Sequence, residues 1–394
     1  MPLAIFALTI AAYAIGTTEF VIVGLLPTVA ADLHITLPLA GLIVSVYALG
    51  VTFGAPILTA LTGKIERKPL LLGLMALFVV GNVAAAVSPS YETLLVARVL
   101  SAFAHGVFFS VGATIAADLV PENRRGSAIA MMFMGLTVAI VTGVPIGTYI
   151  GQIFGWRATF WAVAGLGVIA FAGIAALLPG TLKKAPPASL LDQVRVLGSG
   201  RLIIVFAMTA LGYGGTFVAF TFLAPILQDV TGFSEKSVGL ILVLYGIAIA
   251  AGNIGGGKIA NHNPVKALIG LFLAQAIVLL VFSFTAVSPV LTLITLVALG
   301  FLSFANVPGL QLYVVQRLAK EHRPGAVDVA SALNIAAFNL GIAIGAWLGG
   351  LVVESPMGLA ATPWVGAILV AIALILTLWS SALDRRASLS LKTA

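Results

Sequence analysis

The sequence has no cysteine and very little charge. Without cysteine the chain forms no disulfide, holds no thiolate metal site and has no cysteine nucleophile. Only 8% of its 394 residues are charged, whereas soluble domains carry ~25%. The chain therefore lacks the polar surface of a water-soluble body, and lipid must be its solvent. It also has no HExxH sequence, no paired interior aspartates and no nucleotide-binding loop, so we expect no enzyme, metal, cofactor or ATP-driven pump.

Long apolar runs fill most of the chain, and 61% of the residues are hydrophobic. A helix needs ~20 predominantly apolar residues to cross a bilayer. Twelve runs meet this requirement, which predicts an all-α integral membrane protein with twelve transmembrane helices in two six-helix bundles. The first run is too long for a removable signal peptide, so we expect it to be retained. The predicted spans are 3–29, 38–61, 69–88, 92–117, 127–151, 158–179, 202–227, 237–257, 265–286, 289–315, 327–352 and 362–383.

The connections between these spans are short, with one exception in the middle of the chain. That segment is rich in Pro, Lys and Ser, as linkers are. It divides the chain into an N-terminal bundle at 1–180, a cytoplasmic linker at 181–200 and a C-terminal bundle at 201–394. No loop could hold a soluble catalytic or output domain, so we expect the protein to act within the bilayer.

The 20 Lys and Arg residues indicate the orientation. With a cytoplasmic N-terminus, 17 of them fall in inner segments, 2 in outer segments and 1, Arg98, within a span. Cytoplasmic loops of membrane proteins carry such an excess. We therefore predict a multi-pass protein of the cell (inner) membrane with both termini cytoplasmic. The net charge of +7 then marks topology rather than a nucleic-acid partner.

The two halves carry matching patterns. Predicted spans five and eleven each have three glycines spaced four residues apart, and the two sets are 198 residues apart. Such ladders let helices approach closely, and Pro145 within the first one predicts a bend. Two parallel repeats are typical of transporters whose bundles move about a site near the bilayer midplane. The ladders are Gly143, Gly147 and Gly151, and Gly341, Gly345 and Gly349.

Three stretches carry a family resemblance: GTTEFVIVGLLP, RVLSAFAHGVFFSVGATIAADLVP, and TGVPIGTYIG followed by FGWRATFW. With them the whole chain resembles a major facilitator superfamily transporter, and more narrowly the twelve-span drug:proton antiporters close to arabinose and sugar efflux permeases. The resemblance implies the major facilitator fold, alternating access and proton-coupled export of small drug-like molecules or sugars. It implies a small-molecule substrate, protons and the lipid bilayer as partners, and we expect a monomer to function.

The loop after span two departs from the family's usual G-x-x-x-D-R-x-G-R-R. Here LTGKIERKP has Lys64, Arg67 and Lys68, but Gly63 stands in place of the acidic residue and Glu66 in place of a glycine. We predict that this loop forms the cytoplasmic gate, with Glu66 as a candidate carboxylate for it.

Ionisable residues within the predicted spans are few. Of thirteen acidic residues only Glu19 is deep; Arg98 is the one base inside a span, and His105 follows on the same helical stripe. A charged side chain at the bilayer centre costs at least ~2.5–3.5 kcal/mol, and such groups face the bundle interior and find partners. We therefore expect Glu19 to meet Arg98 or His105.

Glu19 is the predicted proton-coupling residue. A carboxylate that alternates between dry and wet surroundings, or between paired and unpaired states, changes its proton affinity with conformation, as coupling requires. The alternative is a permanent ion pair of Glu19 with Arg98. Arg98 is a candidate for gating or for proton or substrate contact. His105 is a candidate for a relay or substrate contact, with a neutral hydrogen-bonded histidine as the alternative.

Predicted span seven supplies candidate cavity residues. Tyr213 and Phe217 lie there among small residues, and aromatic walls suit amphipathic or weakly polar ligands. In the superfamily that the chain resembles, spans one, four, seven and ten line the cavity. A competing function is a facilitator or a proton-coupled importer of a small metabolite, in which the Glu19–Arg98 pair is only structural.

Overall fold

The computed structural model describes residues 2–62, 65–121, 125–180, 182, 195–320 and 327–393. The secondary structure of these residues is helical and contains no strand. Twelve of the described helical stretches are long and apolar enough to cross a bilayer. The predicted fold class and the number and order of the spans are confirmed.

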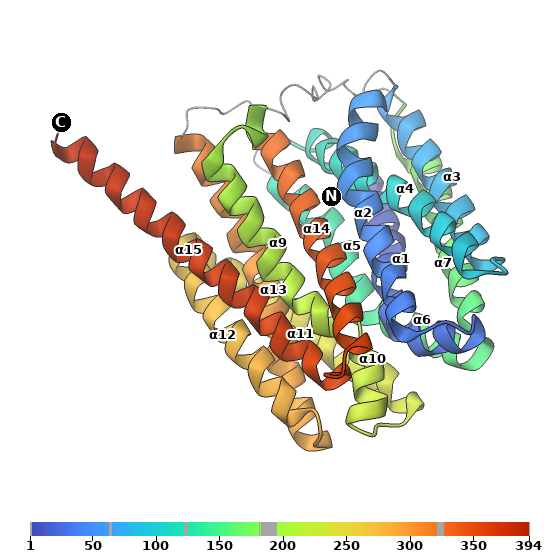
Figure 1. The fold of residues 1–394 in the computed structure, drawn as a ribbon. Coiled ribbons are helices and arrows are strands. Elements are labelled where there is room, and N and C mark those ends of the chain that lie inside the picture. The colour runs from blue at the N-terminus through green and yellow to red at the C-terminus, as the bar shows by residue number, and fades with distance from the viewer. Residues whose placement is uncertain are drawn as a thin grey trace.

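The helices follow from the solvent, because in lipid every backbone N–H and C=O must find its partner within the segment. Figure 1 labels them. The first group is α1 (Leu3–Asp32), α2 (Leu37–Thr62), α3 (Arg67–Ala86), α4 (Tyr91–Asp118), α5 (Arg125–Val138), α6 (Val144–Phe154) and α7 (Trp156–Leu177). The second group is α9 (Gly200–Phe220), α10 (Leu223–Pro225), α11 (Glu235–His262), α12 (Pro264–Thr285), α13 (Pro289–Lys320), α14 (Val327–Glu354) and α15 (Thr362–Thr393), with a 3-10 turn at Leu359–Ala361.

Predicted span five is not one regular helix. It consists of α5, a π-helical segment at Ala139–Gly143 and α6. A proline has no N–H to donate, and its ring clashes with the carbonyl four residues earlier. Pro145 places that clash at Val141, in the middle of the π-helical segment, so the bend that Pro145 predicts takes the form of a local widening of the helix.

Predicted span seven, 202–227, is shorter than expected for a similar reason. α9 ends at Phe220, and α10 and a π-helical segment at Ile226–Val230 continue the path. Pro225 lies four residues after Thr221, the first residue beyond the end of α9. The apolar run therefore contains a break that hydropathy alone does not reveal.

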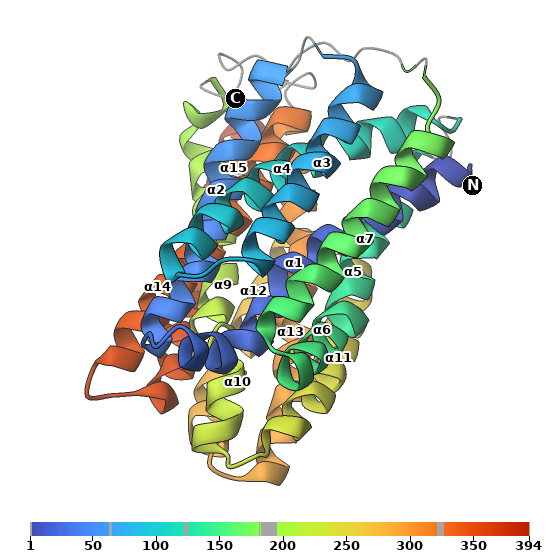
Figure 2. The same cartoon turned by 90° about the vertical axis from the view of Figure 1, so that its right-hand side faces the viewer.

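The helices pack in two groups. In the first, α1 contacts α5, α6 and α7, while α4 contacts α2 and α3. In the second, α9 contacts α14 and α15, and α13 contacts α11 and α12. Figure 1 shows the two groups side by side, and in Figure 2 the first group faces the viewer. We call the end where α7 stops and α9 starts the linker end. Most of the predicted linker lies outside the described residues, so the domain boundaries at 180 and 200 stay predictions.

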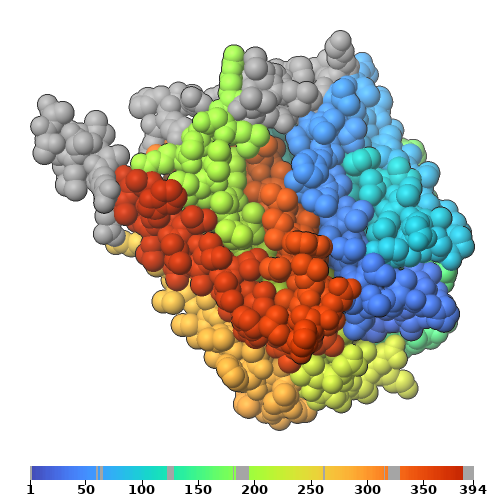
Figure 3. Space-filling view, viewed as in Figure 1, coloured from blue at the N-terminus to red at the C-terminus, as the bar shows by residue number. Residues whose placement is uncertain are grey.

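The two groups meet mainly along two surfaces, with a smaller contact between α1 and α10. The first, which we call the α2–α14 seam, is visible at the front of Figure 3. Ser45 Oγ on α2 donates to the Ala343 carbonyl on α14 at 3.0 Å, and Thr52 Oγ1 lies 3.3 Å from the Ala336 carbonyl. The second, the α11 seam, joins α11 to α6 and the π-helical segment. These seams place the space between the groups at the centre of the molecule.

Candidate functional site

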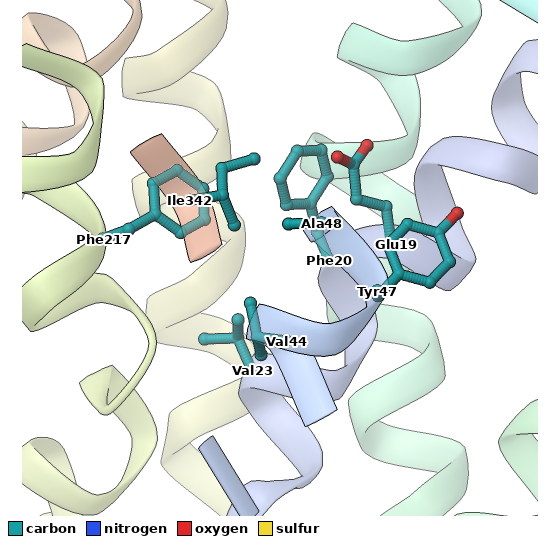
Figure 4. Close-up of a pocket in the computed structure, with 8 residues that line it drawn as sticks. All are labelled: Glu19, Phe20, Val23, Val44, Tyr47, Ala48, Phe217 and Ile342. Atoms are coloured by element: carbon teal, nitrogen blue, oxygen red, sulfur yellow. The ribbon is translucent and has the colours of Figure 1, made fainter. Parts of the chain in front are cut away.

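Glu19 lies near the middle of α1, and only 8% of it is exposed. It borders a small cavity of about 10 Å³ between the two groups of helices, roughly the space that a single water molecule needs. Pockets for drug-sized ligands enclose ~300–1,000 Å³, so this conformation is too tight for such a ligand. Figure 4 shows Glu19 and Tyr47 on one side of the cavity, facing Phe217 and Ile342 on the other. The lining residues are Glu19, Phe20 and Val23 of α1, Val44, Tyr47 and Ala48 of α2, Phe217 of α9 and Ile342 of α14.

His105 of α4 approaches Glu19 from behind the cavity wall. Its Nδ1 lies 4.0 Å from Glu19 Oε2 and 3.1 Å from the hydroxyl of Tyr47. His105 is 5% exposed and packs against the ring of Phe109. The structure thus brings two of the predicted ionisable residues together, with Tyr47 as a third partner.

Arg98 does not form the ion pair with Glu19 that was the alternative to a proton-carrying role. Its Nη1 donates to the Thr18 carbonyl at 2.8 Å and to Thr18 Oγ1 at 3.0 Å. Its guanidinium carbon lies 4.0 Å from the centre of the Tyr47 ring, a cation–π contact. Arg98 is fully buried, and its Nε and Nη2 have no hydrogen-bond partner in the described part of the chain. The structure therefore contradicts an ion pair between Glu19 and Arg98. Arg98 instead joins α4 to the backbone of α1 one residue before Glu19.

Thr18 and Asn82 complete the polar group around Arg98, and sequence reasoning missed both. The Thr18 hydroxyl donates to Asn82 Oδ1 at 2.6 Å, and Asn82 Nδ2 donates to the Phe78 carbonyl in its own helix at 2.8 Å. Both residues are fully buried. A polar side chain in the middle of an apolar span indicates that a buried hydrogen bond exists. The sequence does not indicate which residue provides the other side of that bond.

Of the two predicted cavity residues, Phe217 lines the cavity and Tyr213 lies beside it without lining it. Their ring centres are 5.1 Å apart, and the Phe217 ring lies 6.3 Å from that of Phe20. Tyr213 also contacts the rings of Phe304 and Phe338. The wall contributed by the second group is therefore aromatic.

The glycine ladder of span five lies against α1. A Cβ added at Gly143 would meet Thr17 Oγ1, and one at Gly151 would meet Leu25 Cδ2. At Gly147 it would come within 2.5 Å of Val21 Cγ2. These glycines let α6 and the π-helical segment approach the helix that carries Glu19, while Pro145 shapes the bend just described.

The predicted gate loop is described in part. Lys64 lies outside the described residues. Arg67 Nη1 pairs with Asp118 Oδ2 of α4 at 2.6 Å, and Lys68 Nζ donates to the carbonyls of Ala175 and Leu178 at the end of α7. Glu66 is exposed just before α3. The carboxylate that Arg67 uses is thus Asp118 rather than Glu66.

The second group of helices contains a similar polar cluster without ionisable partners of the Glu19 kind. Gln275 Nε2 donates to Thr216 Oγ1 at 2.5 Å and to the Gly212 carbonyl at 3.2 Å. Its Oε1 accepts from Asn306 Nδ2 at 2.8 Å. Nearby, the Tyr245 hydroxyl lies 3.1 Å from Ser303 Oγ. The side chains that form this cluster are amides and hydroxyls.

The sequence profile of the Major Facilitator Superfamily matches residues 8–330. The chain belongs to this superfamily. A solved D-xylose–proton symporter has the same fold, with a TM-score of 0.75 over 95% of this chain and 96% of that chain, although only 16% of the residues are identical. The fold implied by the family resemblance is confirmed.

Relatives extend over nearly the whole chain. The MFS-type transporter YtbD of Bacillus subtilis (strain 168) is 56% identical over 383 residues, covering 97% of this chain and 96% of YtbD. The chloramphenicol resistance protein of Streptomyces lividans is 34% identical over 385 residues, covering 95% of each. This chain is therefore a multi-pass membrane transporter of the superfamily and not an enzyme.

Proposed function

We propose that this protein is a proton-coupled exporter of small drug-like molecules or sugars, and that Glu19 carries the coupling proton. The observation that supports it best is the position of Glu19. The carboxylate lies at the cavity between the two helix groups, buried, and 4.0 Å from the ring of His105. Alternating access moves these groups relative to one another, so it changes the surroundings of a side chain at their interface.

Such a change in surroundings is what proton coupling requires. A carboxylate held in a dry space is costly to keep charged, whereas one exposed to water or next to a cation is not. Glu19 lines the cavity itself, whereas Arg98 donates to Thr18 and lies behind the ring of Tyr47. We assign Arg98 to holding α1 and α4 together, and His105 to contact with the Glu19 carboxyl group.

The cavity wall opposite Glu19 indicates the class of substrate. Phe217, backed by Tyr213, offers aromatic area with few directional demands, which suits amphipathic or weakly polar molecules. A relative named for chloramphenicol resistance supports export of a drug-like compound. We place both termini and the linker on the cytoplasmic side, in the cell membrane, where Arg67 and Asp118 would belong to the cytoplasmic gate.

Uptake into everted membrane vesicles tests this function. A pH gradient, acid inside, is imposed, and accumulation of chloramphenicol, ethidium and arabinose is followed separately. We expect at least one compound to accumulate in response to the gradient, and Glu19→Gln to abolish that response. Glu354→Gln, which neutralises an exposed carboxylate at the end of α14 and outside the cavity, is the matched control and should behave as the wild type.

Two results would contradict the proposal. If Glu19→Gln vesicles still accumulate the compound in response to the gradient, Glu19 does not carry the proton. If wild-type vesicles equilibrate the compound and ignore the gradient, the protein is a facilitator.

A further inference from the structure

Tyr47 of α2 joins three features that the proposed function treats separately. Its hydroxyl lies 3.1 Å from His105 Nδ1, and its ring lies under the guanidinium of Arg98 with 4.0 Å between the guanidinium carbon and the ring centre. The same ring lines the cavity beside Glu19. Tyr47 is 1% exposed and also packs with Val51 and Ala102.

The helix that carries Tyr47 is also bound to the other half of the molecule. Ser45, two residues before Tyr47, donates to the Ala343 carbonyl of α14, and Thr52, five residues after it, lies near the Ala336 carbonyl. Hydrogen bonds of the α2–α14 seam thus flank Tyr47 on both sides. A rearrangement of the seam must move the backbone from which Tyr47 projects.

We infer that Tyr47 is a positioning residue that links the α2–α14 seam to the proton site, by holding His105 toward Glu19 and by separating Arg98 from the cavity. The inference rests on the proposed role of Glu19 as proton carrier. When the seam rearranges, α2 carries Tyr47 with it, and both the His105 contact and the cover over Arg98 change together.

Few titratable or polar side chains surround Tyr47 and Glu19. Glu19 faces it from α1, and Arg98 and His105 face it from α4. Tyr213 faces Glu19 from α9, and Asn82 of α3 contributes only a neutral amide. With so few charged groups, the hydroxyl of Tyr47 is one of the main determinants of the His105 orientation.

The second half supplies an internal control. Tyr245 and Ser303 lie 198 residues after Tyr47 and His105, and their polar atoms are also 3.1 Å apart. Tyr245 also belongs to a seam helix, α11, next to Gly246, whose added Cβ would come within 2.8 Å of Val141 Cα. The tyrosine and its position are repeated, but its partner cannot titrate. Loss of this hydroxyl should therefore leave the proton site unaffected.

Infrared spectroscopy of the purified protein tests the inference without a known substrate. The protonated-carboxyl band of Glu19 is isolated as the difference between wild type and Glu19→Gln and is titrated with pH. Tyr47→Phe keeps the ring and removes the hydroxyl. We expect it to move the midpoint of the Glu19 band by about 0.5–1 pH unit, while Tyr245→Phe leaves the midpoint in place. The sign of the shift reports which nitrogen of His105 carries the proton.

An unchanged midpoint in Tyr47→Phe, or equal shifts in Tyr47→Phe and Tyr245→Phe, would overturn the inference. A second measurement uses wild-type protein with ring-deuterated tyrosine, so it does not depend on the variant folding. A tyrosine C–O band must change at the same midpoint as the Glu19 band, and its absence would also overturn the inference. If no Glu19 band titrates in the wild type, the proposed function itself fails, which separates the two outcomes.

Discussion

The two halves of this transporter have buried hydrogen bonds at equivalent positions, but they differ in the ionisable residues beside those bonds. Thr18 bonds to Asn82 in the first half, and its equivalent 198 residues later, Thr216, bonds to Gln275 in the second. The tyrosine pairs described above repeat at the same interval. At the equivalent of Glu19, however, the second half has Phe217.

This difference distinguishes buried polar residues that occur in both halves from ionisable residues that occur in one half. A buried polar group in a membrane helix needs a partner wherever it occurs, so the hydrogen bonds of Thr18 and of Thr216 serve packing in their respective halves. The deep ionisable residues Glu19, Arg98 and His105 all belong to the first half, and the facing wall is aromatic. The proposed function therefore assigns the coupling proton to the first half and the aromatic substrate contact to the second.

The largest contrast is expected at the equivalent positions Glu19 and Phe217. Glu19→Gln should remove the response to a pH gradient altogether, because the proton carrier is lost. Phe217→Leu should keep the response and weaken apparent substrate affinity about 5-fold, equal to ~1 kcal/mol of lost aromatic contact. Vesicle uptake at a series of chloramphenicol concentrations separates the two effects. A Phe217→Leu protein without any gradient response would contradict the division between the halves.

Alanine substitutions in the two glycine ladders should lower the stability of the protein by different amounts. A Cβ at Gly345 would collide with the Gly214 carbonyl oxygen, which belongs to the backbone, whereas one at Gly147 would meet the end of the Val21 side chain. Overpacking costs ~1–3 kcal/mol, and we expect Gly345→Ala at the upper end and Gly147→Ala at the lower end. Tryptophan fluorescence during thermal unfolding in detergent reports both. Equal midpoints for the two variants would show that the backbone contact at Gly345 is not rigid.

The aspartates at the linker end allow a smaller test. Asp384 accepts from Arg201, Arg317 and the Tyr313 hydroxyl, while Asp118 accepts from Arg67. Asp384→Asn should therefore destabilise the protein by ~1–2 kcal/mol and Asp118→Asn by ~0.5–1 kcal/mol. Thermal midpoints at low and high salt measure both, and the difference should narrow in high salt because exposed pairs are screened. A larger loss for Asp118→Asn would reverse the comparison.

The neutral amides of the two halves allow a comparison of similar size. Hydrogen bonds between membrane helices contribute ~0.6 kcal/mol on average. Asn82→Leu removes the bond to Thr18, whereas Gln275→Leu removes bonds to Thr216, Asn306 and the Gly212 carbonyl. We expect Gln275→Leu to lower the unfolding free energy by ~1–2 kcal/mol and Asn82→Leu by about half as much. The same thermal assay checks this, and a Gln275→Leu protein as stable as wild type would contradict it.

The fold was predictable because lipid leaves few choices. Apolar runs of sufficient length must form helices, and the distribution of polar residues marks their ends. The exceptions lie where a proline acts four residues away, at Val141 and Thr221, because hydropathy does not register the lost hydrogen bond.

The candidate site was predictable in its members but not in its pairing. Few ionisable residues lie within the predicted spans, so their positions in the sequence singled out Glu19, Arg98 and His105. Arg98, however, binds the carbonyl of Thr18, and since every residue has a carbonyl, no sequence pattern marks that one. Asp118 was overlooked for a related reason: it stands at a helix end 51 residues from Arg67, and only folding brings them together.

Proton release on substrate addition tests the central claim most directly. Purified protein in weakly buffered detergent is mixed with chloramphenicol, ethidium or arabinose while a pH indicator is followed, and binding is measured in parallel. For a compound that binds, we predict release of protons from the wild type and none from Glu19→Gln that still binds it. Equal release from both proteins would show that Glu19 does not carry the coupling proton.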